Sequence, residues 1–132
     1  MSTVRRFSSD GPWEDAFGYS RAVVAGPNAY VSGCTAMVDG VVHHEGDPYR
    51  QALTALGMAL TTLREAGFEA ADVVRTRMYV THTRDMAEVG RAHKELFDKT
   101  RPAATMVVVS KLIDEQMLVE VEVDAYREEA GR

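Results

Sequence analysis

The chain has 132 residues, of which 45% are hydrophobic and 27% are charged, and its formal net charge is −5. We therefore expect one globular domain, spanning residues 1–132, with enough apolar side chains for a packed core. The acidic balance and the lack of a basic stripe argue against nucleic acid or an anionic membrane as a partner, because both are bound mainly by clustered Lys and Arg. The apolar runs are too short for a membrane span, the first residues lack the apolar core of a signal peptide, and the single cysteine cannot form an intrachain disulfide, so we expect a cytoplasmic protein.

The first third of the chain predicts extended segments joined by tight turns. Residues Val4 to Phe7 are predicted as an edge strand that ends in turn residues. The runs 19–25 and 29–34 flank Gly26-Pro27-Asn28, and this pattern predicts an antiparallel hairpin. Asp39-Gly40, a preferred type I′ pair, stands between two valines and predicts a second hairpin.

A long helix is predicted to begin at Asp47, as N-cap, and Pro48, at the first helical position. Gly67 supplies the residue that ends it. Its apolar side chains recur at helical spacing and form one stripe, which comprises Ala52, Leu53, Ala55, Leu56, Ala59, Leu60 and Leu63.

A strand and a second helix are predicted next. The strand runs from Val73 to Thr81, and a capping box of Asp85 and Glu88 begins the helix. His93 lies on the apolar face of that helix, where a hydrogen-bonded core or interface histidine is more typical than a catalytic base. The strand residues that face the helices are Val74, Thr76, Met78 and Val80, and the apolar helix residues are Met86, Val89, Leu96 and Phe97.

The last third predicts two more strands of different character. Residues Thr105 to Val109 form an apolar, β-branched run that is typical of a fully buried strand. From Leu118 to Asp124, valines alternate with acids, so the valines would face the core and the acids the opposite side. Two explanations of the acids stay open: that side of the strand faces solvent, or it belongs to a site or an interface.

This order of elements predicts an α+β fold in which two helices cover one face of a sheet. The uncovered face would carry charges of both signs, which a subunit interface explains better than plain solvent. Its residues are Arg75, Arg77, Tyr79, Glu120, Glu122 and Asp124.

Common catalytic and metal-binding patterns give little support for a site. Cys34 lacks a Cys-His signature and is more typical of a small buried hydrophobic residue than of a nucleophile. His43-His44-Glu45 is better explained as a surface loop than as a metal site, because neighbours on an extended strand point to opposite faces. The nucleophile elbow, the P-loop and the dinucleotide-binding glycine motif are all absent from the sequence.

Five blocks of sequence, in order and spacing, resemble the YjgF/RidA family over most of the chain, from about Phe17 to Ala125. They are Gly18-Tyr19, Tyr30-Val31-Ser32-Gly33, Asp72 to Val80, Arg101-Pro102-Ala103 and Val119-Glu120-Val121-Glu122. The resemblance implies a chorismate-mutase-like α+β domain with a mixed six-stranded sheet and two helices on one face. It also implies a homotrimer around a central barrel, with a small-molecule ligand in each cleft between subunits.

The family resemblance further implies hydrolysis of enamines and imines, such as 2-aminoacrylate and 2-iminopropanoate, to keto acids and ammonia without a metal or organic cofactor. By position, Tyr19, Ser32, Gly33 and Glu120 match family site residues, with Glu120 orienting or activating the attacking water. Deaminating members carry an arginine directly after Pro-Ala to clamp the substrate carboxylate, whereas this chain has Ala104.

The missing arginine leaves two interpretations of function. In the first, the chain hydrolyses a small imine or enamine, with Arg77 or Arg101 as a substitute cation in the substrate site. In the second, it is a non-catalytic trimer that binds a small metabolite or a partner. The acidic charge disfavours a third function, ribonuclease activity.

Overall fold

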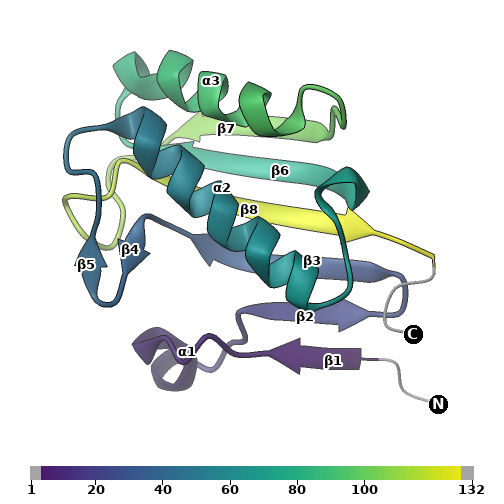
Figure 1. Ribbon diagram of the computed structural model, residues 1–132. Coiled ribbons are helices and arrows are strands. Elements are labelled where there is room, and N and C mark those ends of the chain that lie inside the picture. Colours follow the sequence, from purple (N-terminus) through teal and green to yellow (C-terminus); the bar gives the residue numbers. More distant parts are fainter. Residues whose placement is uncertain (1–3, 129–132) are drawn as a thin grey trace.

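The computed structural model describes residues 4–128, which form a six-stranded sheet with two long helices on one face (Figure 1). The strand order is β1-β2-β3-β8-β6-β7; neighbours are antiparallel except β6 and β7, which are parallel. The strands are β1 (Val4–Phe7), β2 (Ala22–Ala25), β3 (Asn28–Cys34), β6 (Val73–Val80), β7 (Ala103–Val108) and β8 (Val119–Tyr126). The predicted α+β fold with a mixed six-stranded sheet is thereby confirmed.

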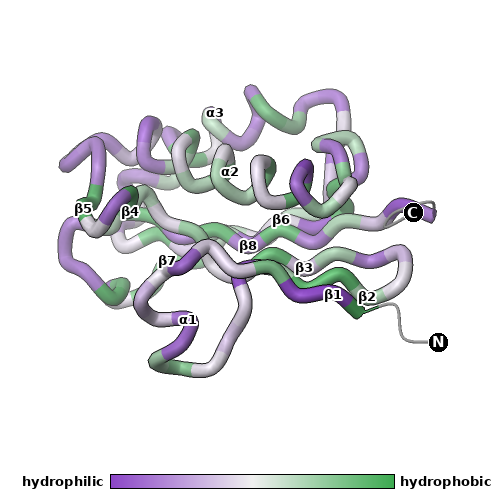
Figure 2. Tube along the Cα trace, turned by 60° about the horizontal axis from the view of Figure 1, so that its bottom comes forward, coloured by the Kyte–Doolittle hydropathy of each residue, from purple (hydrophilic) through white to green (hydrophobic). Residues whose placement is uncertain are grey.

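The remaining elements are three α-helices, a two-stranded ribbon and two short 3₁₀ helices. The α-helices are α1 (Pro12–Phe17), α2 (Pro48–Glu65) and α3 (Met86–Phe97), the ribbon is β4 (Met37–Val38) with β5 (Val41–Val42), and the 3₁₀ helices are η1 (Ala70–Asp72) and η2 (Thr83–Asp85). Figure 2 shows α2 and α3 on one side of the sheet and the α1 segment on the other. Within residues 4–128, no helix has the length and apolar character that crossing a membrane requires.

The predicted hairpins form, although the first begins later than expected. The β2–β3 hairpin turns at Gly26, and β2 starts at Ala22 rather than at residue 19. Asp39 and Gly40 both have positive φ, at 52° and 79°, as a type I′ turn requires. Residues 12–17, for which no helix or strand was predicted, form the short helix α1.

Helix α2 matches its predicted ends. The Asp47 carboxylate accepts a hydrogen bond from the Arg50 amide at 3.0 Å, and Pro48 is the first helical residue. Gly67 has a φ of 94°, and the Phe68 amide donates to the Leu63 carbonyl at 2.9 Å, which closes a Schellman motif. The predicted stripe is buried against the sheet, with Leu53 only partly buried.

Helix α3 follows a 3₁₀ turn instead of the predicted capping box. Asp85 makes no side-chain cap, and the Glu88 carboxylate instead accepts from Arg91 at 2.9 and 3.1 Å. Glu88 therefore pairs with a charged side chain one turn further along the helix and does not cap the helix start. His93 lies 2.8 Å from Thr76 Oγ1 and packs on Phe97, so it is a hydrogen-bonded, partly buried histidine as predicted.

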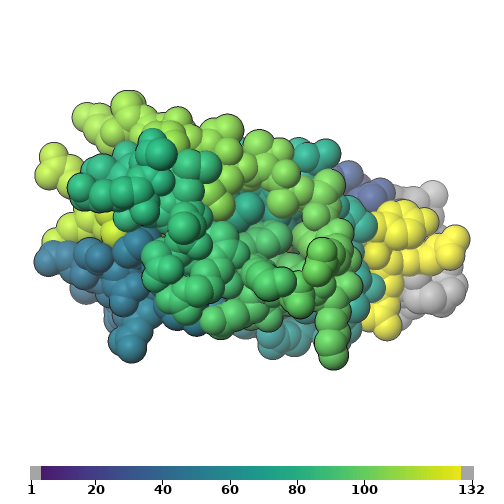
Figure 3. Space-filling model, turned by 90° about the horizontal axis from the view of Figure 1, so that it is seen from above, coloured from purple at the N-terminus to yellow at the C-terminus, as the bar shows by residue number. Residues whose placement is uncertain are grey.

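Two strand predictions are wrong in detail. A bulge between Val73 and Arg75 shifts the register of β6, so Val73 is buried and Val74 is exposed, the reverse of the predicted alternation. Strand β7 was predicted as fully buried, yet Val107 and Val108 are 41% and 47% exposed. β7 is the last strand of the sheet, so one of its edges has no neighbour among the described strands. Figure 3 shows its light-green side chains at the surface beside α3.

Strand β8 joins the core to the uncovered face. Val119, Val121 and Val123 are fully buried under α2. On the other face, the Tyr79 hydroxyl donates to Glu122 at 2.9 Å, and Arg77 pairs with Asp124 at 3.3 Å. Glu122 and Asp124 therefore pair with β6 side chains instead of simply facing water.

Candidate functional site

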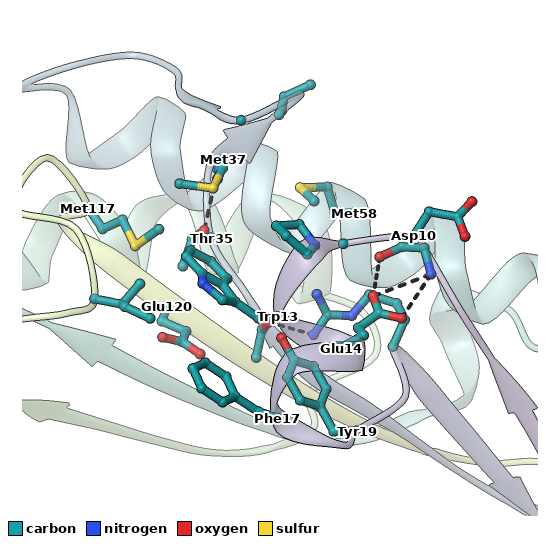
Figure 4. A pocket seen from close by; sticks show the side chains of 18 of the residues that line it. Asp10, Trp13, Glu14, Phe17, Tyr19, Thr35, Met37, Met58, Met117 and Glu120 are labelled. Carbon is teal, nitrogen blue, oxygen red and sulfur yellow. Dashed lines mark hydrogen bonds between the residues drawn. The ribbon is translucent and has the colours of Figure 1, made fainter.

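A cavity of about 640 Å³ lies where the end of β3 and the start of β8 meet α1 and the β4–β5 ribbon (Figure 4). Its wall is mostly apolar, with charged groups on one side. The lining side chains include Trp13, Phe17, Tyr19, Met37, Met58, Ile113 and Met117, together with the charged residues Asp10, Glu14, Arg21, Asp39 and Glu120.

Glu120 and Gly33 are packed together in this cavity. A Cβ atom on Gly33 would collide with Glu120 Oε2, so only glycine leaves room for the carboxylate in this position. The β3–β8 register shifts between Val31 and Cys34, so the irregular segment contains Ser32 and Gly33. Burial, and to a lesser extent the charge of Glu122, raises the pKa of Glu120, while Arg21 opposes the shift. Glu120 is thus a partly buried carboxylate with increased proton affinity.

Arg21 is the basic residue of the cavity, and sequence reasoning missed it. Its Nη2 donates to the Gly33 carbonyl at 2.6 Å, while its Nε is buried and has no hydrogen-bond partner among the described residues. It lies two residues after Tyr19 in an extended run, so alternation alone would place both on one side. That spacing was the signal available in the sequence.

Helix α1 forms the outer wall of the cavity and is fixed by Glu14. This carboxylate is 5% exposed and accepts hydrogen bonds from the Ser8 hydroxyl at 3.0 Å, the Ser9 amide and the Ser9 hydroxyl. Burial alone would raise the pKa of Glu14, but these bonds and the charge of Arg21 bring its pKa below the ordinary value. Glu14 therefore stays ionised and ties the segment before α1 to the helix.

The sequence contained a signal for α1. Pro12 occupies the first helical position, and two acids, Glu14 and Asp15, follow in the first turn. Trp13 and Phe17 stand four residues apart, the spacing that places both side chains on one helix face. Both line the cavity.

The single chain brings together some of the predicted site residues and separates others. Tyr19, Gly33 and Glu120 line the cavity. The Ser32 hydroxyl instead donates to the Ser20 carbonyl at 2.7 Å. Arg77 lies on the open sheet face, and Arg101 belongs to a separate hollow beside α3.

Arg101 and Ala104 lie away from Glu120 within one chain. Arg101 donates to the Asp98 carboxylate at 2.9 Å, and its small hollow of about 250 Å³ also contains His93. Ala104 lies on exposed β7, opposite Thr76 in the β6–β7 register.

Cys34 and the histidine pair add no further chemistry to this site. Cys34 is buried, and burial raises the pKa of its thiol to about 11, which leaves it protonated and unreactive at neutral pH. In residues 4–128, no group of three or more His, Cys, Asp or Glu side chains is placed to hold a metal ion.

The fold and cavity define a small α+β protein with a carboxylate-bearing site at one end of its sheet. A family model described as Endoribonuclease L-PSP matches residues 13–127, so the chain belongs to this family, which is the YjgF/RidA family that its motif blocks resemble.

Relatives agree with this assignment. An uncharacterized protein of Streptomyces coelicolor is 49% identical over 124 residues, which cover 94% of this chain and 92% of that protein. The RutC family protein UK114 of Drosophila melanogaster is 31% identical over 125 residues, which cover 92% of this chain and 90% of that protein. The crystal structure of a Mycobacterium tuberculosis member of the YjgF/YER057c/UK114 family superposes with a TM-score of 0.86 at 42% identity, covering 95% of this chain and 100% of that one.

Proposed function

We propose that the chain is a cofactor-independent hydrolase that deaminates a small imine or enamine, with Glu120 as the general base. The observation that carries this proposal is the position of Glu120: a partly buried carboxylate of raised pKa, facing a cavity large enough for a metabolite. Tyr19 forms part of the wall, and the bulged Ser32-Gly33 segment shapes the space beside the carboxylate.

The proposed reaction begins with water adding to the imine carbon. The new C–O bond forms as the C=N π electrons move to nitrogen, and Glu120 takes a proton from the water. Glu120 then returns this proton to nitrogen, which gives a carbinolamine. It next takes the hydroxyl proton of the carbinolamine and passes it to nitrogen, so the C–N bond breaks as the carbonyl forms, and ammonia leaves with its electron pair. A carboxylate that must first accept and then donate one proton works best when its pKa is raised toward neutrality.

The proposed quaternary structure is a homotrimer in which each cavity is completed by a neighbouring copy. The exposed β7 edge, together with Val74 and Tyr30 on the sheet, offers apolar surface for such contact. In this arrangement Arg77, Arg101 or Ala104 of one copy would reach the cavity of the next, which they do not do within one chain.

We predict that sedimentation equilibrium will give about three times the 14.6 kDa chain mass. Val107→Lys, on the exposed edge, should shift the protein toward monomers, because a charge would replace an apolar contact. Val41→Lys is the matched control, since Val41 is 59% exposed on the ribbon and away from this edge. A monomeric wild-type protein at micromolar concentration would contradict the proposed assembly.

The alternative function is non-catalytic binding of a small metabolite. Ala104 favours it, because the family's carboxylate-clamping residue is missing. Ribonuclease activity, which the family description suggests, receives less support, since the described cavity has acids at Asp10, Glu14, Asp39 and Glu120 that would repel a phosphate backbone.

Ammonia release from imines generated in situ, either from amines by an amine oxidase or from amino acids by an amino-acid oxidase, tests the proposal, with Gly33→Ala as the informative variant. The wild type should exceed the uncatalysed background. The added methyl group displaces the Glu120 carboxylate, so we expect at least about a tenfold loss of rate. The melting temperature should change little, because the tip of a flexible side chain can move aside.

Gly57→Ala is the control for this substitution. Gly57 lies inside α2, where an added Cβ meets nothing within 4 Å, so the rate should stay unchanged. Wild-type release at background for every imine tested would favour the binding function. Equal rates for Gly33→Ala and wild type would show that the position of Glu120 is unimportant.

A further inference from the structure

The cavity is larger than a three-carbon imino acid requires. Its volume of about 640 Å³ lies in the range that accommodates drug-sized ligands. Much of the lining is apolar and comes from elements that the family motifs do not include: α1 with Trp13 and Phe17, Met37 on the ribbon and Met58 on α2. A small ligand would leave this apolar surface in contact with water. The lining therefore favours a ligand with an apolar body.

The charges around the cavity are predominantly negative. Four acidic residues of the described chain line it against one basic residue, Arg21. Glu14 is buried and ionised, and Glu120 faces the same space. Within one chain, the field of these carboxylates disfavours an anion and favours a cation.

Arg21 is poorly placed to replace the missing arginine at position 104. A bidentate clamp needs two neighbouring N–H groups that are free to face one carboxylate. In Arg21, Nη2 is already bonded to the Gly33 carbonyl at 2.6 Å, and Nε is buried. Its positive charge also interacts with the carboxylates of Glu14 and Glu120. In Glu14 it adds to the lowering of the pKa, and in Glu120 it opposes the rise that burial causes.

Aromatic rings that line the cavity also favour a cationic ligand. Figure 4 shows the Trp13 indole, the Phe17 ring and the Glu120 carboxylate turned toward the same cavity. Aromatic faces attract ammonium-like groups, and a planar cation beside a carboxylate gains from both interactions.

We infer that this cavity takes a cationic imine, an iminium, that carries an apolar body and no carboxylate. The inference rests on the proposed function for its imine chemistry but concerns a separate property, the charge and size of the ligand. It also explains why position 104 carries alanine instead of arginine, since a substrate without a carboxylate needs no arginine clamp.

Three probes of one shape test the charge preference: benzamidine is a stable planar cation that resembles an aryl iminium, benzamide is neutral and benzoate is an anion. Trp13 is the chain's single tryptophan and lines the cavity, so its fluorescence reports binding at this site. We expect benzamidine to bind about tenfold or more tighter than benzoate, with benzamide between them. Tighter binding of benzoate, or no binding of any of the three, would overturn the inference.

Two variants outside the proposed catalytic machinery identify the source of the preference. Asp39→Asn keeps an Asn-Gly type I′ turn while removing one acid, so it should weaken benzamidine binding and strengthen benzoate binding several-fold. Phe17→Leu keeps apolar bulk on a residue that is 70% exposed, and it should weaken benzamidine more than benzamide. Unchanged probe selectivity in both variants would remove the basis for the inference.

Two imines that differ only in a carboxylate separate this inference from the proposed function. An amine oxidase generates one from 2-phenylethylamine, and an amino-acid oxidase generates the other from phenylalanine. We expect faster ammonia release from the carboxylate-free imine. Faster release from the imino acid would overturn the inference and keep the hydrolase. Benzamidine-selective binding without accelerated release from either would keep the ligand class and reject the hydrolase.

Discussion

Glu120→Gln should lower the rate of imine hydrolysis by about 10²–10⁴-fold, because glutamine keeps the size of the side chain but cannot accept the proton of the attacking water. Folding should change little, since Glu120 is only partly buried and its carboxylate contacts the cavity rather than the core. The measurements are ammonia release and the melting temperature of both proteins. Equal losses of folding and activity would indicate a structural role instead.

Glu122→Gln is the matched control on the same strand and face. The Glu122 carboxylate accepts from the Tyr79 hydroxyl at 2.9 Å and does not line the cavity in the described chain, so the maximal rate should persist. Its charge does raise the pKa of Glu120. The control should therefore keep the rate while altering its pH dependence.

The pH profile supplies a second readout of the same residue. A general base must be deprotonated, so the rate should fall as pH falls through the pKa of Glu120. Burial raises this pKa, which places the acid limb at higher pH than for an ordinary glutamate. Glu122→Gln should move the limb to lower pH. If the acid limb is identical in the wild type and in Glu122→Gln, the limb reports the titration of a group other than Glu120.

The elements that sequence predicts well are those whose signals are local. Asp47 and Pro48 begin α2 and Gly67 ends it, because capping depends on neighbouring backbone groups. The Asp39-Gly40 turn forms for the same reason. The alternation in β8 also holds, since a strand buried on one face must keep its register.

The predictions that failed depended on distant partners. Thr105 to Val109 is apolar enough for a central strand, yet the described chain places β7 at the edge, where apolar side chains remain exposed. Val73 and Val74 exchanged faces because a bulge, which the residue types do not announce, shifts the register with β8.

For the candidate site, motif resemblance located Glu120, Gly33 and Tyr19, which line one cavity. It did not locate Arg21 or α1, because neither belongs to a motif block. Both reach the cavity only when the N-terminal part of the chain folds beside the distant strand β8. The size and charge of the cavity follow from such contacts, and these properties could not be predicted from the blocks.

Ala104→Arg should raise hydrolysis of 2-iminopropanoate by about thirty-fold, equivalent to about 2 kcal/mol from a charge-assisted pair with the substrate carboxylate. A three-carbon imino acid offers little apolar surface, so most of its binding must come from its carboxylate, and a guanidinium forms the bidentate contact suited to it. Ala104 is exposed on β7, so the longer side chain disturbs no core packing. The wild type should hydrolyse this imine slowly or not at all.

Ala103→Arg is the matched control, because residue 103 is also exposed on β7 but its side chain points to the opposite face of the strand. It should add the same charge without the gain. Ala104→Arg should also shift preference from the phenylethylamine-derived imine toward the phenylalanine-derived imino acid. A wild type that already hydrolyses 2-iminopropanoate rapidly would show that another cation binds the carboxylate, with Arg77 and Arg101 the residues to replace next. No gain in Ala104→Arg would place residue 104 outside the cavity of the assembled protein. It would thereby contradict the proposed contribution of a neighbouring copy.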